Sequence, residues 1–321
     1  MESATSTEAP KLVGGARAPE RVPVLPQERT SGGRSTLAVV RDYVALTKPR
    51  IISLLLLTTV ATMVVAKPEG LALSTVLWTM LGGYLAAGGA GAINHYLDRE
   101  RDARMARTRA RPLVSGRIAP LHGLVFGIVL GALAFVQLTV TVNLLSGVLA
   151  MTGLLGYVFV YTMWLKPLTP QNIVIGGAAG AVPPLVGWAA ASGGLTLDSL
   201  YPFAIVFLWT PPHFWALSLL IKDDYARTGV PMLPVVRGEA ATRRQIVVYA
   251  AVLAAFTVMP FATGLFGLPY LAAAVALGGG FLGLALRLAG NPSRKAALRL
   301  YLSSLAYLAL LFSAMAIDRV I

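Results

Sequence analysis

Long runs without charged side chains dominate this sequence. Asp, Glu, Lys and Arg are absent from seven stretches: 51–66, 70–97, 118–165, 167–197, 199–221, 245–286 and 300–317. Because a membrane-spanning helix needs roughly 20 apolar residues, the stretches 118–165 and 245–286 each predict two helices, and the other five predict one each. The pattern therefore predicts an all-α, polytopic membrane protein with nine transmembrane helices.

The first of these helices is the least regular. The stretch 51–66 is short, but it can extend back through Tyr43 if Lys48 and Arg50 reach toward the membrane interface. Pro49 is expected to bend that helix or to start it.

The basic residues orient the predicted helices. With a cytoplasmic N-terminus, 25 of the 27 Lys and Arg residues fall on the cytoplasmic side, and only Lys67 and Arg319 do not. Nine spans then place the C-terminus outside. The net charge of +13 therefore reflects membrane topology rather than nucleic-acid binding.

Composition excludes several classes of protein. Hydrophobic residues make up 56% of the chain and charged residues 13%, against about 25% charged in soluble domains, which excludes an ordinary soluble fold. The sequence has no cysteine. It therefore has no disulfide, no zinc–cysteine site, no iron–sulfur cluster and no covalent c-type haem attachment.

Residues 1–40 are polar and rich in Pro, Gly, Ser and Arg. They lack the apolar segment of a signal peptide, and four glutamates argue against a mitochondrial transit peptide. We expect a disordered cytoplasmic tail over 1–40, followed by one transmembrane domain over 41–321.

Carboxylates gather at the predicted cytoplasmic end of the second helix. Asn94, Asp98 and Asp102 stand at i, i+4 and i+8, on one helical face, whereas Glu100 points elsewhere. Two carboxylates and an amide oxygen form a hard oxygen site that suits Mg²⁺ shared with substrate phosphates. The alternative is a solvated helix end whose charges are balanced by Arg99, Arg101, Arg104, Arg107, Arg109 and Arg111.

A second acidic pair, Asp223 and Asp224, ends the predicted sixth helix on the same side. An ordinary helix end is a stronger alternative here. However, Gly229, Pro231 and Pro234 indicate a shaped loop. The two groups hint at a weak internal repeat, with two acidic edges facing one cavity.

Six motifs together resemble the UbiA-type intramembrane prenyltransferases, over about 40–320. They are Leu46-Thr-Lys-Pro-Arg50, Asn94-x-x-x-Asp98-x-x-x-Asp102, Arg107-Thr-x-x-Arg111-Pro-Leu, Tyr161-Thr-x-x-Leu-Lys166, Pro211-Pro-His-Phe-Trp-Ala-Leu217, and Lys222-Asp-Asp-Tyr225 followed by Gly229-x-Pro-Met-Leu-Pro234. The last two are similar to the branch of the family that prenylates haem.

The resemblance implies nine helices around a central cavity with a cytoplasmic cap. It implies catalytic, Mg²⁺-binding roles for Asp98 and Asp102, with Asn94, at one edge, and for Asp223 and Asp224 at the other. The implied substrate-binding residues are Lys48, Arg50, Arg107, Arg111, Tyr161, Lys166, Lys222 and His213. One departure concerns the second motif, D-x-x-x-D in the wider family, because Leu220 stands four residues before Asp224.

The implied reaction transfers a farnesyl group from farnesyl diphosphate to a vinyl group of haem b, which yields haem O and pyrophosphate. Mg²⁺ and cations stabilise the leaving group, and a dry cavity protects the allylic cation. The implied location is the cell membrane of a bacterium or archaeon. A protein that donates haem or acts in the haem A pathway is an implied possible partner.

His213 follows two prolines that are expected to break the regular helical bonding and open a pocket. It is a candidate axial ligand of the haem acceptor, and the alternative is a packed histidine bonded to a freed carbonyl. For His95, on a different helical face from Asn94, the packed role is favoured more strongly.

Two other functions stay open at this stage. Nine helices with buried glycines and prolines also fit a transporter, although the charged clusters lie at one face rather than at mid-membrane. The acceptor could instead be an aromatic acid or a quinone precursor, and only the haem-branch motifs argue against this.

Overall fold

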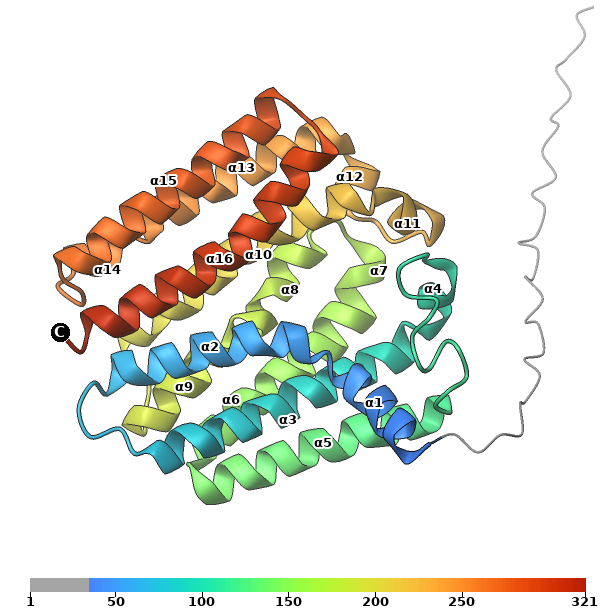
Figure 1. Ribbon diagram of the computed structural model, residues 1–321, viewed down its shortest axis with the longest axis horizontal. Coiled ribbons are helices and arrows are strands. Elements are labelled where there is room, and N and C mark those ends of the chain that lie inside the picture. Colours follow the sequence, from blue (N-terminus) through green and yellow to red (C-terminus); the bar gives the residue numbers. More distant parts are fainter. Residues whose placement is uncertain (1–34) are drawn as a thin grey trace, which may run out of the picture. The chain divides into compact units, whose positions relative to one another are not determined.

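The computed structural model describes residues 35–321, so most of the predicted tail lies outside the described residues. Throughout this part of the chain every regular element is a helix, and nine helices are long and apolar enough to cross a membrane (Figure 1). They span Pro49–Ala66, Leu73–Leu97, Pro120–Thr141, Leu144–Leu168, Asn172–Ser192, Leu197–Leu220, Gly238–Ala262, Leu268–Gly290 and Arg294–Asp318. The predicted fold class and number of spans are confirmed.

The chain turns sharply before the first span. Helix α1 (Thr36–Thr47) ends at Lys48, and α2 (Pro49–Ala66) begins with its proline. Lys48 adopts the left-handed conformation, with φ 59° and ψ 54°, which is uncommon for a residue other than glycine. The proline that follows excludes the right-handed helical conformation that would continue α1. Pro49 therefore starts the helix as predicted, but the extension through Tyr43 is wrong, since α1 is a separate helix.

The second and third spans are packed backbone against backbone. Gly89 lies in α3 (Leu73–Leu97) and Gly127 in α5 (Pro120–Thr141). A Cβ added at Gly89 would lie 2.7 Å from the Gly127 carbonyl oxygen. Such close approach is how small residues stabilise helix pairs in membranes.

The fourth span changes its helical form midway. It runs from α6 (Leu144–Leu155) through a π-helix, η1 (Gly156–Leu165), into the short α7 (Lys166–Leu168). The fifth span bends at Ala181, between α8 (Asn172–Gly180) and α9 (Val182–Ser192). Long π segments are rare and are found mainly at functional sites.

The remaining spans form the largest buried apolar cluster. The sixth contains η2 (Leu197–Ser199) and α10 (Leu200–Leu220), and the seventh contains α13 (Gly238–Phe256) and α14 (Met259–Ala262). Helices α15 (Leu268–Gly290) and α16 (Arg294–Asp318) follow. Helix α10 is continuous through Pro211 and Pro212. Neither proline has an N–H to donate, so two helical bonds are missing there, but the helix keeps its path because a membrane helix tolerates prolines where neighbouring helices pack around them.

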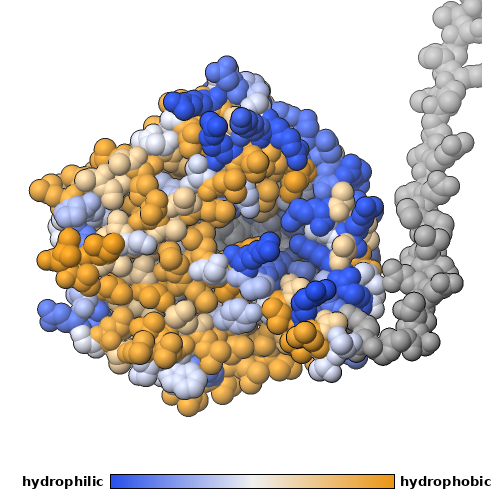
Figure 2. Space-filling view, viewed as in Figure 1, coloured by the Kyte–Doolittle hydropathy of each residue, from blue (hydrophilic) through white to orange (hydrophobic). Residues whose placement is uncertain are grey.

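Short helices gather at one end of the bundle, at the right of Figure 1. They are α4 (Arg99–Arg104), α7, α11 (Lys222–Arg227) and α12 (Leu233–Val236). Hydrophilic residues concentrate toward this end, while hydrophobic residues cover most of the rest of the visible face (Figure 2). Both acidic groups thus lie at the same end of the bundle.

Candidate active site

The first acidic group, Asn94, Asp98 and Asp102, stands where α3 passes into α4. Backbone bonds from Asp98 N to Asn94 O and from Asp102 N to Asp98 O preserve the i+4 spacing across the break. All three side chains are buried, with exposures of 4%, 2% and 4%. The Asn94 amide donates to Asp98 Oδ2 over 2.7 Å, so these two share one face as their spacing requires. Glu100 is exposed and forms an ion pair with the adjacent Arg99.

Three cations from different segments close on this group. Lys166 Nζ lies 2.5 Å from Asp98 Oδ2, and Arg111 NH1 lies 2.5 Å from Asp102 Oδ2. Lys48, at the junction of α1 and α2, donates to Asn94 Oδ1 over 2.7 Å. We call these six residues the charged mouth: Lys48, Asn94, Asp98, Asp102, Arg111 and Lys166.

The mouth shifts the pKa of two of its members. Burial lowers the pKa of Lys48 to about 7, and the positive charges of Arg111 and Lys166 add to this decrease. The negative charges of Asp98 and Asp102 raise the pKa of Lys48 and so oppose the decrease only in part. Burial alone would raise the pKa of Asp98, but the Lys166 charge and hydrogen bonds from Lys166, Asn94 and Arg101 outweigh it, so the pKa is lowered. Asp98 is therefore ionised at neutral pH although it is buried.

The π-helix sets the position of the fourth span against α3. Thr162 Oγ1 donates to the carbonyl of Tyr157, five residues earlier, over 2.9 Å. The Asn94 amide in turn donates to Thr162 Oγ1 over 3.3 Å. The wide π turn thus brings Thr162 to Asn94 and places Lys166, one turn later, on Asp98.

The second acidic group, Asp223 and Asp224 in α11, is divided. Asp224 is 8% exposed; its Oδ1 accepts a bond from Ala106 N over 3.3 Å and pairs with Arg227. Asp223 is exposed. Asp224 therefore ties the loop after α4 to α11, whereas Asp223 faces solvent.

Tyr225 lies between the two acidic groups. Burial raises the pKa of Tyr225 to about 12. The positive charges of Arg107 and Arg111 oppose this increase, and the negative charges of Asp98 and Asp102 add to it. Its hydroxyl is therefore protonated at neutral pH, and the charges that act on it are those of the first acidic group and its arginines. Arg107 itself is exposed beside it.

Three of the predicted substrate-binding residues lie apart from the mouth. Lys222 pairs with Glu239 of α13. Arg50 is exposed, on the first turn of α2. Tyr161 packs in the apolar cluster that contains Met105, and its ring lies against Gly176, where an added Cβ would come within 2.3 Å of it.

The two candidate histidines have different surroundings. His213 is partly exposed in α10; its Nδ1 lies 2.6 Å from Ser304 Oγ of α16, and its ring stacks on Trp209. His95 is 4% exposed, and neither of its ring nitrogens meets a hydrogen-bond partner within residues 35–321.

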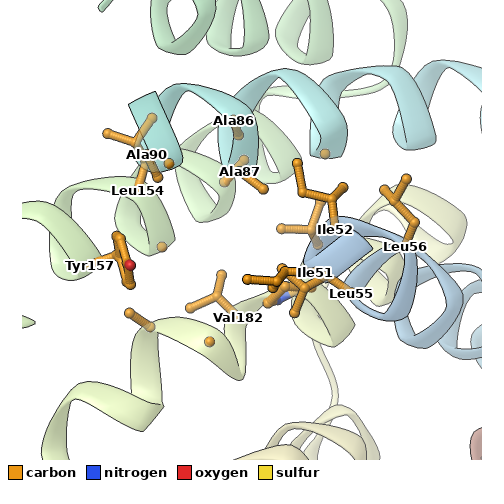
Figure 3. Close-up of a pocket in the computed structure, with 18 of the residues that line it drawn as sticks. Ile51, Ile52, Leu55, Leu56, Ala86, Ala87, Ala90, Leu154, Tyr157 and Val182 are labelled. Atoms are coloured by element: carbon orange, nitrogen blue, oxygen red, sulfur yellow. The ribbon is translucent and has the colours of Figure 1, made fainter. Parts of the chain in front are cut away.

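An apolar cavity begins at the mouth. It holds about 1070 Å³ of empty space, its open side included, and Lys48 and Tyr157 belong to its lining. Its walls are aliphatic side chains of α2 and small residues of α3, with Leu154 and Val182 opposite (Figure 3). Figure 2 also shows a hollow near the middle of the visible face, with hydrophilic residues along part of its rim.

The mouth supplies the donor types of a hard divalent cation without enclosing one. No group of three His, Asp or Glu side chains is poised for a metal anywhere in the described part of the chain. Asp98, Asp102 and Asn94 supply oxygen donors, yet each already bonds a cationic side chain. They fit a cation that completes its coordination with water and phosphate oxygens.

Sequence reasoning missed Tyr157, Thr162 and Tyr225 as members of the site. Tyr157 precedes Lys166 in an unbroken apolar stretch that carries no sign of a π turn. Thr162 was visible in the Tyr161-Thr-x-x-Leu-Lys166 motif, but nothing there indicated its contact with Asn94. Tyr225 was visible in the Lys222-Asp-Asp-Tyr225 motif, and its position directly after Asp224 was the available signal.

Fold and site together define a class: an integral membrane protein with a charged mouth at one end and an apolar cavity beneath it. Comparison with known families matches residues 55–311 to the UbiA prenyltransferase family. The chain belongs to that family.

Curated relatives agree with this. A protein named protoheme IX farnesyltransferase from Roseiflexus sp. (strain RS-1) is 54% identical over 285 residues, which cover 88% of this chain and 53% of that protein. The chain thus spans about half the length of that relative. One of the same name from Symbiobacterium thermophilum is 54% identical over 284 residues, covering 87% of this chain and 94% of that protein.

Solved structures share the fold. A digeranylgeranylglyceryl phosphate synthase structure has a TM-score of 0.73 at 16% identity and covers 88% of this chain and 99% of its own. A UbiA homologue from Archaeoglobus fulgidus, bound to DMAPP and Mg²⁺, has a TM-score of 0.64 at 15% identity and covers 86% of this chain and 99% of its own.

Proposed function

We propose that this chain is a Mg²⁺-dependent prenyltransferase that transfers a farnesyl group from farnesyl diphosphate to a vinyl group of haem b. The products are haem O and pyrophosphate. The observation that carries the proposal is that Lys48 belongs both to the charged mouth and to the lining of the apolar cavity. Prenyl diphosphates, with an anionic head and an apolar chain, are complementary to such a junction. The names of the relatives that are 54% identical supply the acceptor.

The diphosphate head takes the mouth in this proposal. Lys48, Lys166 and Arg111 approach from three segments and would transfer their hydrogen bonds to phosphate oxygens. Mg²⁺, held by Asn94, Asp98 and Asp102 and at the second edge by Asp223 and Asp224, would neutralise the departing pyrophosphate. The Archaeoglobus homologue, whose structure holds DMAPP and Mg²⁺, supports a divalent cation as the partner of a prenyl diphosphate.

The prenyl chain takes the cavity. Along α2 the lining runs from Lys48 to Thr59, which is about 16 Å at 1.5 Å per residue. Ala86, Ala87 and Ala90 leave room on the α3 wall. A cavity lined almost wholly by carbon keeps water from the allylic cation that forms when the C–O bond to pyrophosphate breaks. The cavity lining contains few ionisable groups. This disfavours the transporter alternative, because a transporter requires such groups along the path of its substrate through the membrane.

The new bond joins the farnesyl C1 to the terminal carbon of the vinyl group. The vinyl π electrons form it, and the cation left next to the porphyrin takes up water and loses a proton, which gives the hydroxyl of haem O. His213 is the proposed anchor of the acceptor iron, because its partly exposed ring lies on α10, the helix that leads into α11.

The test is to incubate the purified full chain with farnesyl diphosphate, haem b and Mg²⁺ and to measure the mass of the extracted pigment. We expect a mass gain of one farnesyl group plus one hydroxyl group, because the water that is taken up loses a proton. Farnesylation of an aromatic acid or quinone precursor, with haem unchanged, would replace the acceptor. Farnesyl diphosphate left intact with every acceptor would overturn the proposal.

We place the chain in the cell membrane with the mouth on the cytoplasmic side. Because the chain has no cysteine, single cysteines introduced at Ser115, Gly229 or Ser192 report sidedness cleanly. Those at Ser115 and Gly229 should react with an impermeant maleimide from the cytoplasmic side only, and that at Ser192 from the opposite side only. Reversed labelling would overturn the orientation.

A further inference from the structure

Two aromatic rings hold the imidazole of His213 between them. Its ring centroid lies 4.2 Å from that of Trp209, one turn earlier in α10, and 5.0 Å from that of Tyr301 in α16. The interplanar angles are 18° and 30°. His213 is therefore stacked between two helices, and its free rotation about the ring axis is restricted.

The hydrogen bonds of Ser304 decide which ring nitrogen of His213 carries the proton. Ser304 Oγ lies 2.6 Å from His213 Nδ1 and 2.6 Å from the Tyr301 carbonyl oxygen. A serine hydroxyl has one proton, and a carbonyl oxygen can only accept. The hydroxyl proton therefore goes to Tyr301, and His213 must donate its Nδ1 proton to Ser304 Oγ.

This arrangement leaves the lone pair of a neutral imidazole on Nε2, the form that ligates iron. Ser304 is fully buried, and its backbone carbonyl accepts a second bond from Trp209 Nε1 over 2.8 Å. The backbone bond fixes the position of Ser304 against Trp209, and a hydroxyl that turned away would lose its bond to His213.

We propose that Ser304 is a positioning residue: it holds His213 as the Nδ1-protonated tautomer, so that Nε2 is presented to the iron of the haem acceptor. The proposal rests on the proposed function for the identity of the acceptor, but the tautomer itself does not. Partners that orient a metal-ligating histidine typically change metal affinity 10- to 100-fold when removed.

The first measurement needs no haem. Nitrogen NMR of the ¹⁵N-histidine-labelled full chain distinguishes a protonated Nδ1 from a protonated Nε2, and with three histidines the His213→Ala variant assigns the signal. We expect a protonated Nδ1 in the native chain and a mixed population in Ser304→Ala. A protonated Nε2 in the native chain would overturn the proposal.

The second measurement titrates ferric haem b alone and records its Soret band. Ser304→Ala should weaken haem affinity about 10- to 100-fold and shift the band, whereas farnesyl diphosphate binding stays unchanged. In a His213→Ala background the same substitution should add no further loss. Ser304→Thr, which keeps the hydroxyl, should restore the native spectrum. Ser313→Ala, which removes a hydroxyl bonded only within α16 to Ala309, is the matched control.

The outcomes separate the two proposals. If the native chain makes haem O while Ser304→Ala leaves haem affinity and spectrum unchanged, the role of Ser304 is overturned and the proposed function stands. If the native chain makes no haem O, the proposed function fails, and the NMR result alone decides the tautomer.

Discussion

The two acidic edges of the site differ in what their carboxylates already bind. At the end of α3, Asp98 and Asp102 are buried. Asp98 pairs with Lys166, 68 residues away, and Asp102 pairs with Arg111, nine residues further along the chain. In α11, Asp224 binds its near neighbour Arg227 and one backbone amide, and Asp223 faces solvent. The first edge is thus preassembled by tertiary structure, whereas the second depends mainly on its own short helix.

This difference assigns the edges different tasks. Preorganised charges that need no rearrangement are the strongest source of electrostatic stabilisation in an active site. The first edge has that property. At the second edge, Asp224 of α11 accepts a hydrogen bond from Ala106 in the loop after α4. A contact between two short surface segments suits a part of the protein that closes over bound substrate.

The largest effect is expected at the first edge. Asp98→Ala or Asp102→Ala should lower turnover by about 10²–10³-fold, because each removes a ligand and charge partner that acts in the transition state. Turnover is to be measured on variants that retain native thermal unfolding. Glu100→Ala, on the exposed side, is the control and should be mild. More than about a tenth of native activity in either aspartate variant would contradict the assignment.

A smaller loss is expected at the second edge, and it should be unequal. Asp224→Asn should lower kcat/KM by about 10- to 100-fold, the worth of a hydrogen bond to a charged group. Asp223→Asn should cost less, because that carboxylate is exposed. Equal losses in the two variants would show that the edges are more alike than their contacts indicate.

The cavity beneath the first edge predicts a change in chain-length preference. Ala87→Leu fills the α3 wall, so the variant should favour geranyl over farnesyl diphosphate by about tenfold relative to the native chain. Competition between the two diphosphates measures this ratio. Ala132→Leu, at an exposed position of α5, should leave it unchanged. An unchanged ratio in Ala87→Leu would place the prenyl chain elsewhere.

The smallest effect is expected for Lys222, which pairs with Glu239 away from the mouth. Because an exposed ion pair contributes only about 0–1 kcal/mol, Lys222→Ala should leave kcat and KM within about twofold of native values. Lys166→Ala removes the closer of the two cations on buried Asp98 and leaves it with Arg101, so that variant should by contrast be severely impaired. A large loss in Lys222→Ala would return this lysine to the substrate site.

Hydropathy predicted the nine spans because the bilayer imposes length and composition on every helix. The stacking of Asn94 and Asp98 was equally accessible, since i and i+4 face the same way in any helix. Neither inference required knowledge of a neighbouring helix.

The missed features all depend on neighbours. The π turn over Gly156–Leu165 has no periodic signature in a run that is apolar on every side. The pairing of Lys166 with Asp98 joins residues 68 positions apart, and the bond from His213 to Ser304 joins residues 91 apart. Lys222 belongs to a motif shared by resemblance, but the packing of α13 brings Glu239 to it instead.

The cations and carboxylates of the charged mouth neutralise one another in the structure. Binding of a diphosphate and a metal ion there must replace these ion pairs with new ones. When Lys166 leaves Asp98 for a phosphate oxygen, the buried carboxylate keeps only the longer contact with Arg101, and a second cation in place of Lys166 offsets the cost of losing a buried partner. A divalent cation that binds without a diphosphate would be repelled by the positive charges of Lys48, Lys166 and Arg111. We therefore expect diphosphate and metal to bind cooperatively, each raising the affinity for the other by the same factor. The mouth would then respond to the two together and only weakly to either alone.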